Sequence, residues 1–272
     1  MYTPALRLSL VVGLASVLSA CGGGGGGSSS GGGNTPAPPV SNASPGGLWQ
    51  GIDPITGVRA YALVAEDGRF QLILDDGTPE TQYWGTLVTS GNSLSSSNIQ
   101  VAAGPTYYGS ATITGGSVSA RQTITAPFRY TPAPGCAPTV CGTAESGTFS
   151  LSFNAIYNQG GALSRITGNW QDEATGQIIN INSAGVLFAQ DAVTGCVTNG
   201  QVSTINTAYN AYAVTYTYSN CRFPNNQRNG TTATGLAFVD TNLNPNRGYF
   251  AGQYRAGNTA YTTYAYGRKL GG

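Results

Sequence analysis

The chain has 272 residues, and its 12 basic and 11 acidic side chains nearly balance without forming a cluster. Nucleic-acid binding depends on many Lys and Arg contacts to phosphates, so this balance argues against a nucleic-acid partner. The sequence contains no histidine. This removes the Ser-His-Asp and Cys-His catalytic arrangements and every imidazole metal ligand.

The first twenty residues have the composition of an export signal. Arg7 precedes an apolar run over residues 8–18, which is shorter than the roughly 20 residues that a membrane-spanning helix needs. The segment ends in Leu18-Ser19-Ala20-Cys21, which resembles the lipobox of bacterial lipoproteins.

The lipobox resemblance implies that residues 1–20 are a signal peptide and that Cys21 receives the acyl chains, such as palmitate, that hold the protein on a membrane. In sorted lipoproteins of Gram-negative bacteria, Asp after the cysteine favours the inner membrane. Gly22 stands there in this chain, so we expect the outer membrane, on its periplasmic or its surface face. The alternative is an ordinary signal peptide cut after Ala20, with Cys21 left as a free thiol.

Residues 21–46 are expected to form a flexible tether that carries the lipidated cysteine. Their sequence after Cys21 consists almost entirely of Gly, Ser, Pro, Ala and Asn, and such a segment cannot bury enough apolar surface to offset the entropy of ordering. A Gly tract directly after the lipid-carrying cysteine resembles surface lipoproteins such as transferrin-binding protein B, which carry small β-barrels.

From Leu48 onward, apolar residues recur at every second position between Gly, Asn, Asp and Ser turns. This pattern predicts an all-β fold. One example is the run 60–65, the turn Glu66-Asp67-Gly68, the run 70–74 and a second acidic turn over 75–77. Asp-Gly between alternating runs is a strong hairpin signal.

An internal repeat divides this β-rich region. Gly47-Leu48-Trp49-Gln50 returns as Gly168-Asn169-Trp170-Gln171. A Phe-bearing strand (Phe70; Phe188), an acidic turn (Asp75; Asp191) and a Gly-led strand (Gly85; Gly200) follow each copy. We therefore expect two β domains, 47–164 and 165–272, each an antiparallel barrel or sandwich of about eight strands. A single larger sandwich is the alternative.

The Gly-x-Trp sequence at the start of each copy resembles the first strand of lipocalin-like barrels, in which the Trp closes the barrel floor. That resemblance implies that Trp49 and Trp170 lie at the bottom of a barrel. Simple core packing of both indoles is the competing interpretation.

Four cysteines remain after Cys21, and an even number in an exported chain predicts disulfides. Cys136 and Cys141 flank a short loop and can form a local bridge. Cys196 and Cys221 are centred on the turn candidate 206–210, so we expect them at the ends of two adjacent antiparallel strands. Zinc binding by the four is disfavoured because the spacings are not CxxC and histidine is absent.

The acidic residues offer little catalytic potential. They fall mostly in predicted turns such as Glu66-Asp67 and Asp172-Glu173, whereas a glycosidase needs two carboxyl groups facing a cleft. We therefore expect neither catalytic residues, nor a metal site, nor a cofactor.

Tyrosine is the most suggestive candidate for binding. Tyr212, Tyr216 and Tyr218 share one strand face, as do Tyr264 and Tyr266 on the last strand. They belong either to aromatic packing in a small core or to a face that contacts a sugar or a protein. The first functional hypothesis is a non-catalytic binding module of the cell envelope, whose partner is a protein, a glycan or a small apolar ligand. The alternative is a lipocalin-like carrier of a small apolar ligand.

Overall fold

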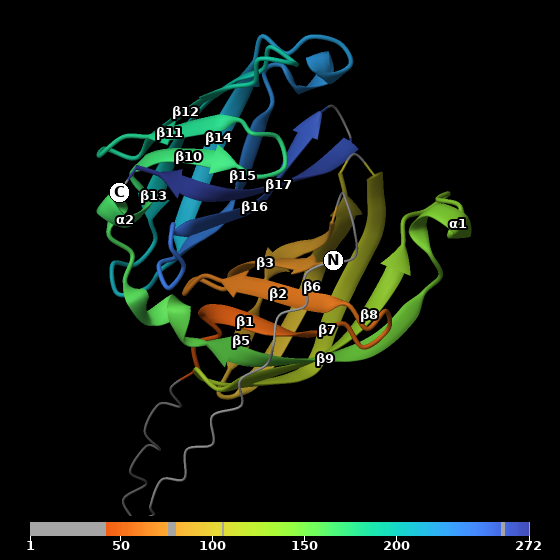
Figure 1. The fold of residues 1–272 in the computed structure, drawn as a ribbon. Coiled ribbons are helices and arrows are strands. Elements are labelled where there is room, and N and C mark those ends of the chain that lie inside the picture. Colours follow the sequence, from red (N-terminus) through yellow and green to blue (C-terminus); the bar gives the residue numbers. More distant parts are fainter. Residues whose placement is uncertain (1–41, 76–79, 105, 257–258, 272) are drawn as a thin grey trace, which may run out of the picture. The chain divides into compact units, whose positions relative to one another are not determined.

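The computed structural model describes residues 42–75, 80–104, 106–256 and 259–271. These residues form two closed antiparallel β-barrels that follow one another along the chain (Figure 1). The expectation of an all-β fold with two small units is confirmed, and the units are barrels rather than parts of one sandwich. The signal peptide, Cys21 and the tether up to residue 41 lie outside the described residues.

The first barrel is built from nine strands. These strands are β1 (Gly47–Ile52), β2 (Arg59–Val64), β3 (Arg69–Leu74), β4 (Thr81–Thr86), β5 (Val88–Ser90), β6 (Ser93–Ala103), β7 (Thr106–Ser119), β8 (Thr123–Pro132) and β9 (Glu145–Asn154). Pairing of β1 with β9 and of β4 with β6 closes a ring of eight, while the short β5 pairs only with β6.

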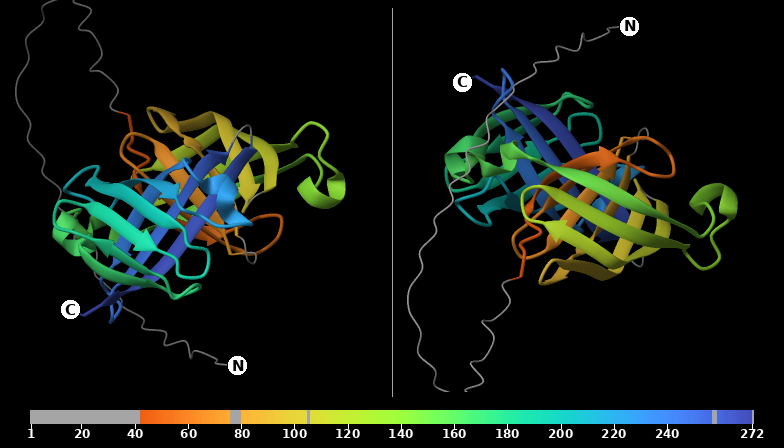
Figure 2. Two further views of the ribbon diagram at one scale, coloured as in Figure 1. Left: turned by 90° about the horizontal axis from the view of Figure 1, so that it is seen from above. Right: turned by 90° about the horizontal axis from the view of Figure 1, so that it is seen from below.

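The second barrel is an uninterrupted ring of eight strands in chain order, seen as the green-to-blue colours running around it (Figure 2). These strands are β10 (Gly168–Asp172), β11 (Ile178–Ile181), β12 (Val186–Gln190), β13 (Val197–Thr204), β14 (Tyr212–Ser219), β15 (Thr232–Asp240), β16 (Arg247–Ala256) and β17 (Thr259–Leu270). Pairing of β10 with β17 closes the ring.

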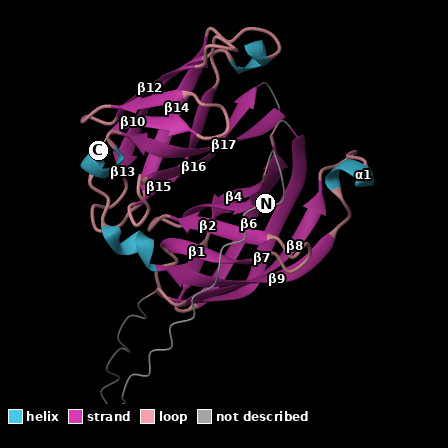
Figure 3. Cartoon of the chain, viewed as in Figure 1, coloured by secondary structure: helices cyan, strands magenta, loops and turns pink. Residues whose placement is uncertain are grey.

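Helical segments in the described residues are short and lie in the connections (Figure 3). They are α1 (Pro138–Cys141), η1 (Ala155–Gln159), α2 (Leu163–Ile166) and η2 (Asn225–Arg228). None of the helices in this part of the chain has the length and apolar character needed to cross a membrane.

The repeat inferred from Gly-x-Trp is visible in the structure. Trp49 in β1 is fully buried and Trp170 in β10 is 4% exposed. Each indole N–H donates to the backbone carbonyl four residues earlier, at Pro45 and Ile166 respectively. Equivalent Trp residues on equivalent strands therefore have the same hydrogen-bonding environment.

One step of the proposed repeat alignment is wrong. Gly85 pairs with Phe70, whereas Gly200 pairs with Leu187 rather than with Phe188. Because side chains alternate between the two faces of a strand, a shift of one residue reverses the direction in which a side chain points. Phe70 is accordingly buried, and Phe188 is 46% exposed.

The ordered chain begins earlier than its composition predicts. Residues 42–46 were expected to belong to the tether, yet they pack on the first barrel, and Pro45 and Gly46 are buried. The backbone N–H of Ala43 donates to the carbonyl of Gly91 over 2.9 Å. Contact with Trp49 fixes this segment, and composition alone does not reveal such a contact.

The connection between the barrels is also packed. Tyr157 of η1 is fully buried and stacks on Tyr209 at 5.0 Å between ring centroids. It belongs to an apolar cluster that contains Leu48 and Leu63 of the first barrel and Leu236 of the second. The two barrels thus share buried apolar surface.

Both predicted cysteine pairs lie at disulfide distance. Cys136 pairs with Cys141 at one end of α1, and Cys196 pairs with Cys221. The register of β13 and β14 matches Val197 with Ser219, so the second pair lies just beyond the ends of two adjacent strands. The turn expected over 206–210 connects those strands.

Candidate functional site

The interior of the first barrel is filled. Its inward-facing side chains are mostly Leu, Ile, Val and Phe, and Phe128 stacks on Phe149 at 4.9 Å between ring centroids. The space left among them is about 40 Å³ and is lined only by apolar residues and Tyr83. A void of this size leaves no room for an organic ligand.

The interior of the second barrel is hollow, with a cavity of about 280 Å³. Glycine and alanine occupy many inward positions of the ring, which leaves the centre unfilled. These small inward residues are Ala189, Gly200, Ala233, Gly235, Ala237, Gly248, Gly252, Ala265 and Gly267. The inward-facing Ile179, Phe250 and Thr263 are only half-buried, because each faces the cavity.

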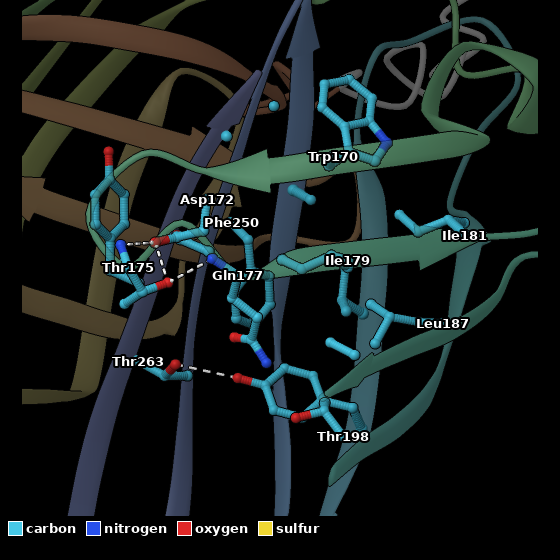
Figure 4. A pocket seen from close by; sticks show the side chains of 18 of the residues that line it. Trp170, Asp172, Thr175, Gln177, Ile179, Ile181, Leu187, Thr198, Phe250 and Thr263 are labelled. Atoms are coloured by element: carbon cyan, nitrogen blue, oxygen red, sulfur yellow. Dashed lines mark hydrogen bonds between the residues drawn. The ribbon is translucent and has the colours of Figure 1, made fainter. Parts of the chain in front are cut away.

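One end of the cavity is lined by apolar side chains, and we call it the floor. Ile166 of α2 and Trp170 of β10 line it, together with Ile181 and Leu187, whose side chains gather on one side of the close-up view (Figure 4). The Nζ atom of Lys269 lies 5.6 Å from the Trp170 ring centroid, and burial lowers the pKa of that amine. Trp170 therefore both packs in the core and lines a cavity floor.

The other end, which we call the mouth, is polar. It is formed by the β10–β11, β12–β13 and β14–β15 connections, and Asp172, Thr175, Gln177, Thr194 and Arg228 line it. Figure 4 shows Asp172, Thr175 and Gln177 on the side of the cavity opposite Ile181 and Leu187. The cavity thus has an apolar floor and a polar mouth.

Two turns at the mouth are built by the same five-residue sequence, Asp-x-x-Thr-Gly. It occurs at 172–176 and 191–195 here, and at 53–57 in the first barrel. In each copy the Thr hydroxyl donates to the Asp carboxylate, and the Gly N–H donates to the Asp carbonyl. The Gly has a φ of 71–73°, a conformation that favours glycine.

Two of these turn carboxylates are buried, although other acidic residues in turns, such as Asp67 and Glu173, are exposed. Asp172 is only 7% exposed, and Asp53 only 3%. Hydrogen bonds from Thr194, followed by those from the turn amides, lower the pKa of the Asp191 carboxyl. The carboxylates hold the turns in shape, which explains why Asp53 and Asp172 can be buried without an ion pair to any residue that the structure describes.

Tyr212, Tyr216 and Tyr218 lie on one face of β14, as their strand parity predicts, and that face points into the second barrel. The Tyr216 hydroxyl lies 3.1 Å from the hydroxyls of both Tyr218 and Thr263, while Tyr212 donates to the carbonyl of Ala162 over 3.1 Å. Burial raises the pKa of Tyr212 to about 12 and that of Tyr216 well above its ordinary value. The Tyr212 and Tyr216 hydroxyls are therefore neutral hydrogen-bonding groups, and Tyr216 and Tyr218 line the cavity wall.

Tyr264 and Tyr266 point the other way, to the outside of β17. Tyr266 packs against Tyr249, and Tyr249 stacks on Phe238 at 4.5 Å between centroids. Phe238 in turn packs on the apolar cluster that the two barrels share. The structure therefore separates the five candidate tyrosines into an inward group on β14 and an outward pair on β17, of which Tyr266 packs on aromatic partners.

Arg228 was not among the candidates from the sequence. It is the last residue of η2, and its guanidinium lies 5.5 Å from the Tyr218 ring centroid and 5.8 Å from that of Tyr254. Its Nε atom is buried and has no hydrogen-bond partner within the described residues. No sequence motif marked this residue, because only the packing of the β14–β15 loop places it at the cavity.

The side chains gathered here provide apolar surface, hydroxyls, an amide and a guanidinium around a cavity. Within the described ranges, no group of three or more Cys, Asp or Glu residues is placed to hold a metal ion. The molecule thus belongs, by architecture, to proteins with two tandem small β-barrels, the second of them hollow. No protein family, curated protein or solved structure matches the chain.

Proposed function

We propose that the second barrel binds a small, mainly apolar molecule in its cavity, and that the chain acts as a non-catalytic carrier or receptor for it. The single observation that carries this proposal is the hollow of about 280 Å³ in a barrel whose partner is filled. Ligand sites commonly have volumes of about 300–1,000 Å³. The ligand is therefore at the small end of that range.

The orientation of the tyrosines supports the carrier over the interaction module. Inward tyrosines beside a cavity provide the wall of a ligand site, whereas an interaction surface needs a free aromatic face. Tyr264 and Tyr266 lie outside, but both are half-buried, and Tyr266 packs on aromatic partners of its own. Protein and glycan partners are thus the second hypothesis.

The proposed setting comes from the sequence alone. We propose that the mature protein begins at an acylated Cys21 and is held on the outer membrane, with residues 22–41 as a tether. Metabolic labelling with palmitate tests this step, because Cys21→Ser should abolish the label. A label that persists in the variant would show that another residue is acylated.

Titration with N-phenyl-1-naphthylamine, a neutral apolar dye that fluoresces when it leaves water, tests the binding site. The full chain carrying Cys21→Ser, which removes competing acyl groups, should bind the dye saturably at one site. Ala265→Phe places a ring inside the cavity and should abolish binding.

Thr215→Phe is the matched control, because Thr215 is exposed on the outer face of β14. It should bind the dye as the parent does. Unsaturable binding, or binding that Ala265→Phe leaves unchanged, would rule out the cavity as the site.

A further inference from the structure

Arg228 is a cation whose position at the cavity is fixed by the fold. Its carbonyl accepts hydrogen bonds from the backbone N–H of Thr231 at 2.9 Å and from the Thr231 hydroxyl at 2.6 Å. The side chain of Asn229 bonds both the N–H and the carbonyl of Cys221. The Cys196–Cys221 disulfide then ties this loop to the end of β13.

The guanidinium held by this loop lacks a partner for one of its donors. Its Nε is buried and makes no hydrogen bond within the described residues. Arg228 also forms no ion pair there, since the two ion pairs in the described parts of the chain join Arg69 to Asp67 and Arg247 to Glu173. Leaving a buried charged donor unsatisfied is costly.

The Arg228 guanidinium has the Tyr254 hydroxyl as a side-chain partner, but within the described residues nothing accepts from its Nε, and several nearby acceptors are already engaged. The Asp191 carboxylate accepts hydrogen bonds from Thr194 and from the amide of Val193, and the Tyr216 and Tyr218 hydroxyls bond one another. Asp172 takes its hydrogen bonds through Oδ1 from its own turn. The acceptor for Arg228 can therefore come from a molecule inside the cavity.

We propose that the ligand is a small aromatic or alicyclic monocarboxylate, with its apolar body against the floor and its carboxylate on Arg228 at the mouth. This inference rests on the proposed function. A carboxylate presents two oxygens in one plane, which suits the planar donors of a guanidinium.

The other charges at the mouth limit the charge of the ligand. Among the described residues that line the cavity, Arg228 is the one basic side chain, while Asp172 and Asp191 line the same end. A group with two negative charges, such as a phosphate monoester, would be repelled by these two carboxylates. A single negative charge at Arg228 offsets the cation without adding a second charge near either Asp.

Calorimetric titration with 1-naphthoate and 1-naphthamide separates charge from shape, since the two probes share one ring system. The full chain carrying Cys21→Ser should bind 1-naphthoate at least about tenfold more tightly than 1-naphthamide. In Arg228→Gln this preference should disappear through loss of 1-naphthoate affinity, while 1-naphthamide affinity stays within about twofold. Arg228→Lys should keep part of the preference.

Arg222→Gln is the matched control, because Arg222 is exposed in the same loop. It should leave both affinities unchanged. Equal affinity of the parent for the two probes would overturn the inference while leaving the proposed function intact. A parallel loss of both probes in Arg228→Gln would show that Arg228 only holds the loop, and this too would overturn it. Binding of neither probe while N-phenyl-1-naphthylamine still binds would overturn the inference alone. Binding of neither probe and no saturable binding of the dye would overturn the proposed function as well.

Discussion

The two barrels have one strand plan and two different interiors. Both begin with a buried Trp whose indole bonds the carbonyl four residues before it, and both use the Asp-x-x-Thr-Gly turn. The first barrel fills its interior with Leu, Ile and Phe, whereas the second has Gly and Ala at many inward positions. Ring geometry is therefore compatible with either a packed core or a cavity, and the inward side chains decide which one forms.

This difference suggests a division of roles between the barrels. A packed barrel contributes stability through buried apolar area. A hollow barrel gives up part of that stabilisation, because a cavity lacks the packing contacts of a filled core. We interpret the second barrel as the binding part and the first as its stable support.

The largest expected effect comes from shortening an aromatic side chain in the packed barrel. Phe149→Ala should lower the free energy of unfolding by about 3–5 kcal/mol, because Phe149 is 4% exposed and stacks on Phe128. Phe250→Ala in the second barrel should cost less, about 1–2 kcal/mol, since this ring already faces the cavity. Urea unfolding measures both, and equal losses would contradict the contrast between the interiors.

Removing each disulfide compares the covalent support of the two barrels. Paired Ser substitutions at Cys196 and Cys221 should cost about 3.5 kcal/mol, and those at Cys136 and Cys141 about 2 kcal/mol, because a longer closed loop restricts the unfolded chain more. The sequence separations are 25 and 5 residues. Thermal and urea unfolding under oxidising conditions provide the comparison, and a reversed order would show that loop entropy does not dominate.

Alkaline pH should destabilise both barrels through their buried tyrosines, among them Tyr130 in the first barrel and Tyr212 in the second. Burial raises the pKa of Tyr130 and of Tyr212 to about 12, whereas an unfolded tyrosine titrates near 10. Between these values the unfolded chain loses protons that the folded chain retains, so stability falls as pH rises. The loss attributable to Tyr212 is roughly 2–3 kcal/mol.

Urea unfolding at pH 9, 10 and 11 measures that slope. Tyr130→Phe and Tyr212→Phe should each make the dependence on pH shallower, because each removes one titrating group. A slope that neither substitution changes would mean that other groups control alkaline unfolding.

The smallest expected effect is that of filling space. Ala265→Leu should stabilise the second barrel by up to about 1 kcal/mol, since the added methyl groups enter an existing cavity. Ala126→Leu in the filled first barrel should destabilise it by about 1–3 kcal/mol through overpacking. Stabilisation by both substitutions would indicate that the first barrel also has usable space.

Much of the fold could be predicted from local patterns. Alternating apolar residues and Asp-Gly turns indicated antiparallel strands, and the spacing of Cys196 and Cys221 indicated the β13–β14 hairpin. Strand parity grouped Tyr212, Tyr216 and Tyr218 on one face. These features depend on residues close together in the sequence or on a two-residue period.

The site itself could be predicted only in part. A change of one residue in the pairing register moves a side chain to the other face of its strand. The sequence therefore did not reveal the outward position of Tyr264 and Tyr266 or the exposure of Phe188. The cavity depends on the summed volume of side chains from all eight strands, so no single segment reveals it. Arg228 reaches the mouth through the fold of its loop, and the packing of residues 42–46 depends on Trp49.

Methyl NMR of the full chain carrying Cys21→Ser, titrated with N-phenyl-1-naphthylamine, tests most directly whether the ligand site is the second barrel. The methyl groups of inward residues in that barrel should shift with the dye, whereas those of the first barrel should not. Reporters for the second barrel are Ile179, Ile181, Leu187, Val202 and Val214, and reporters for the first are Val64, Leu72, Leu94, Ile99 and Ile124. The account predicts shifts confined to the reporters of the second barrel. Shifts in the first barrel alone, in both barrels equally or in neither barrel would contradict it.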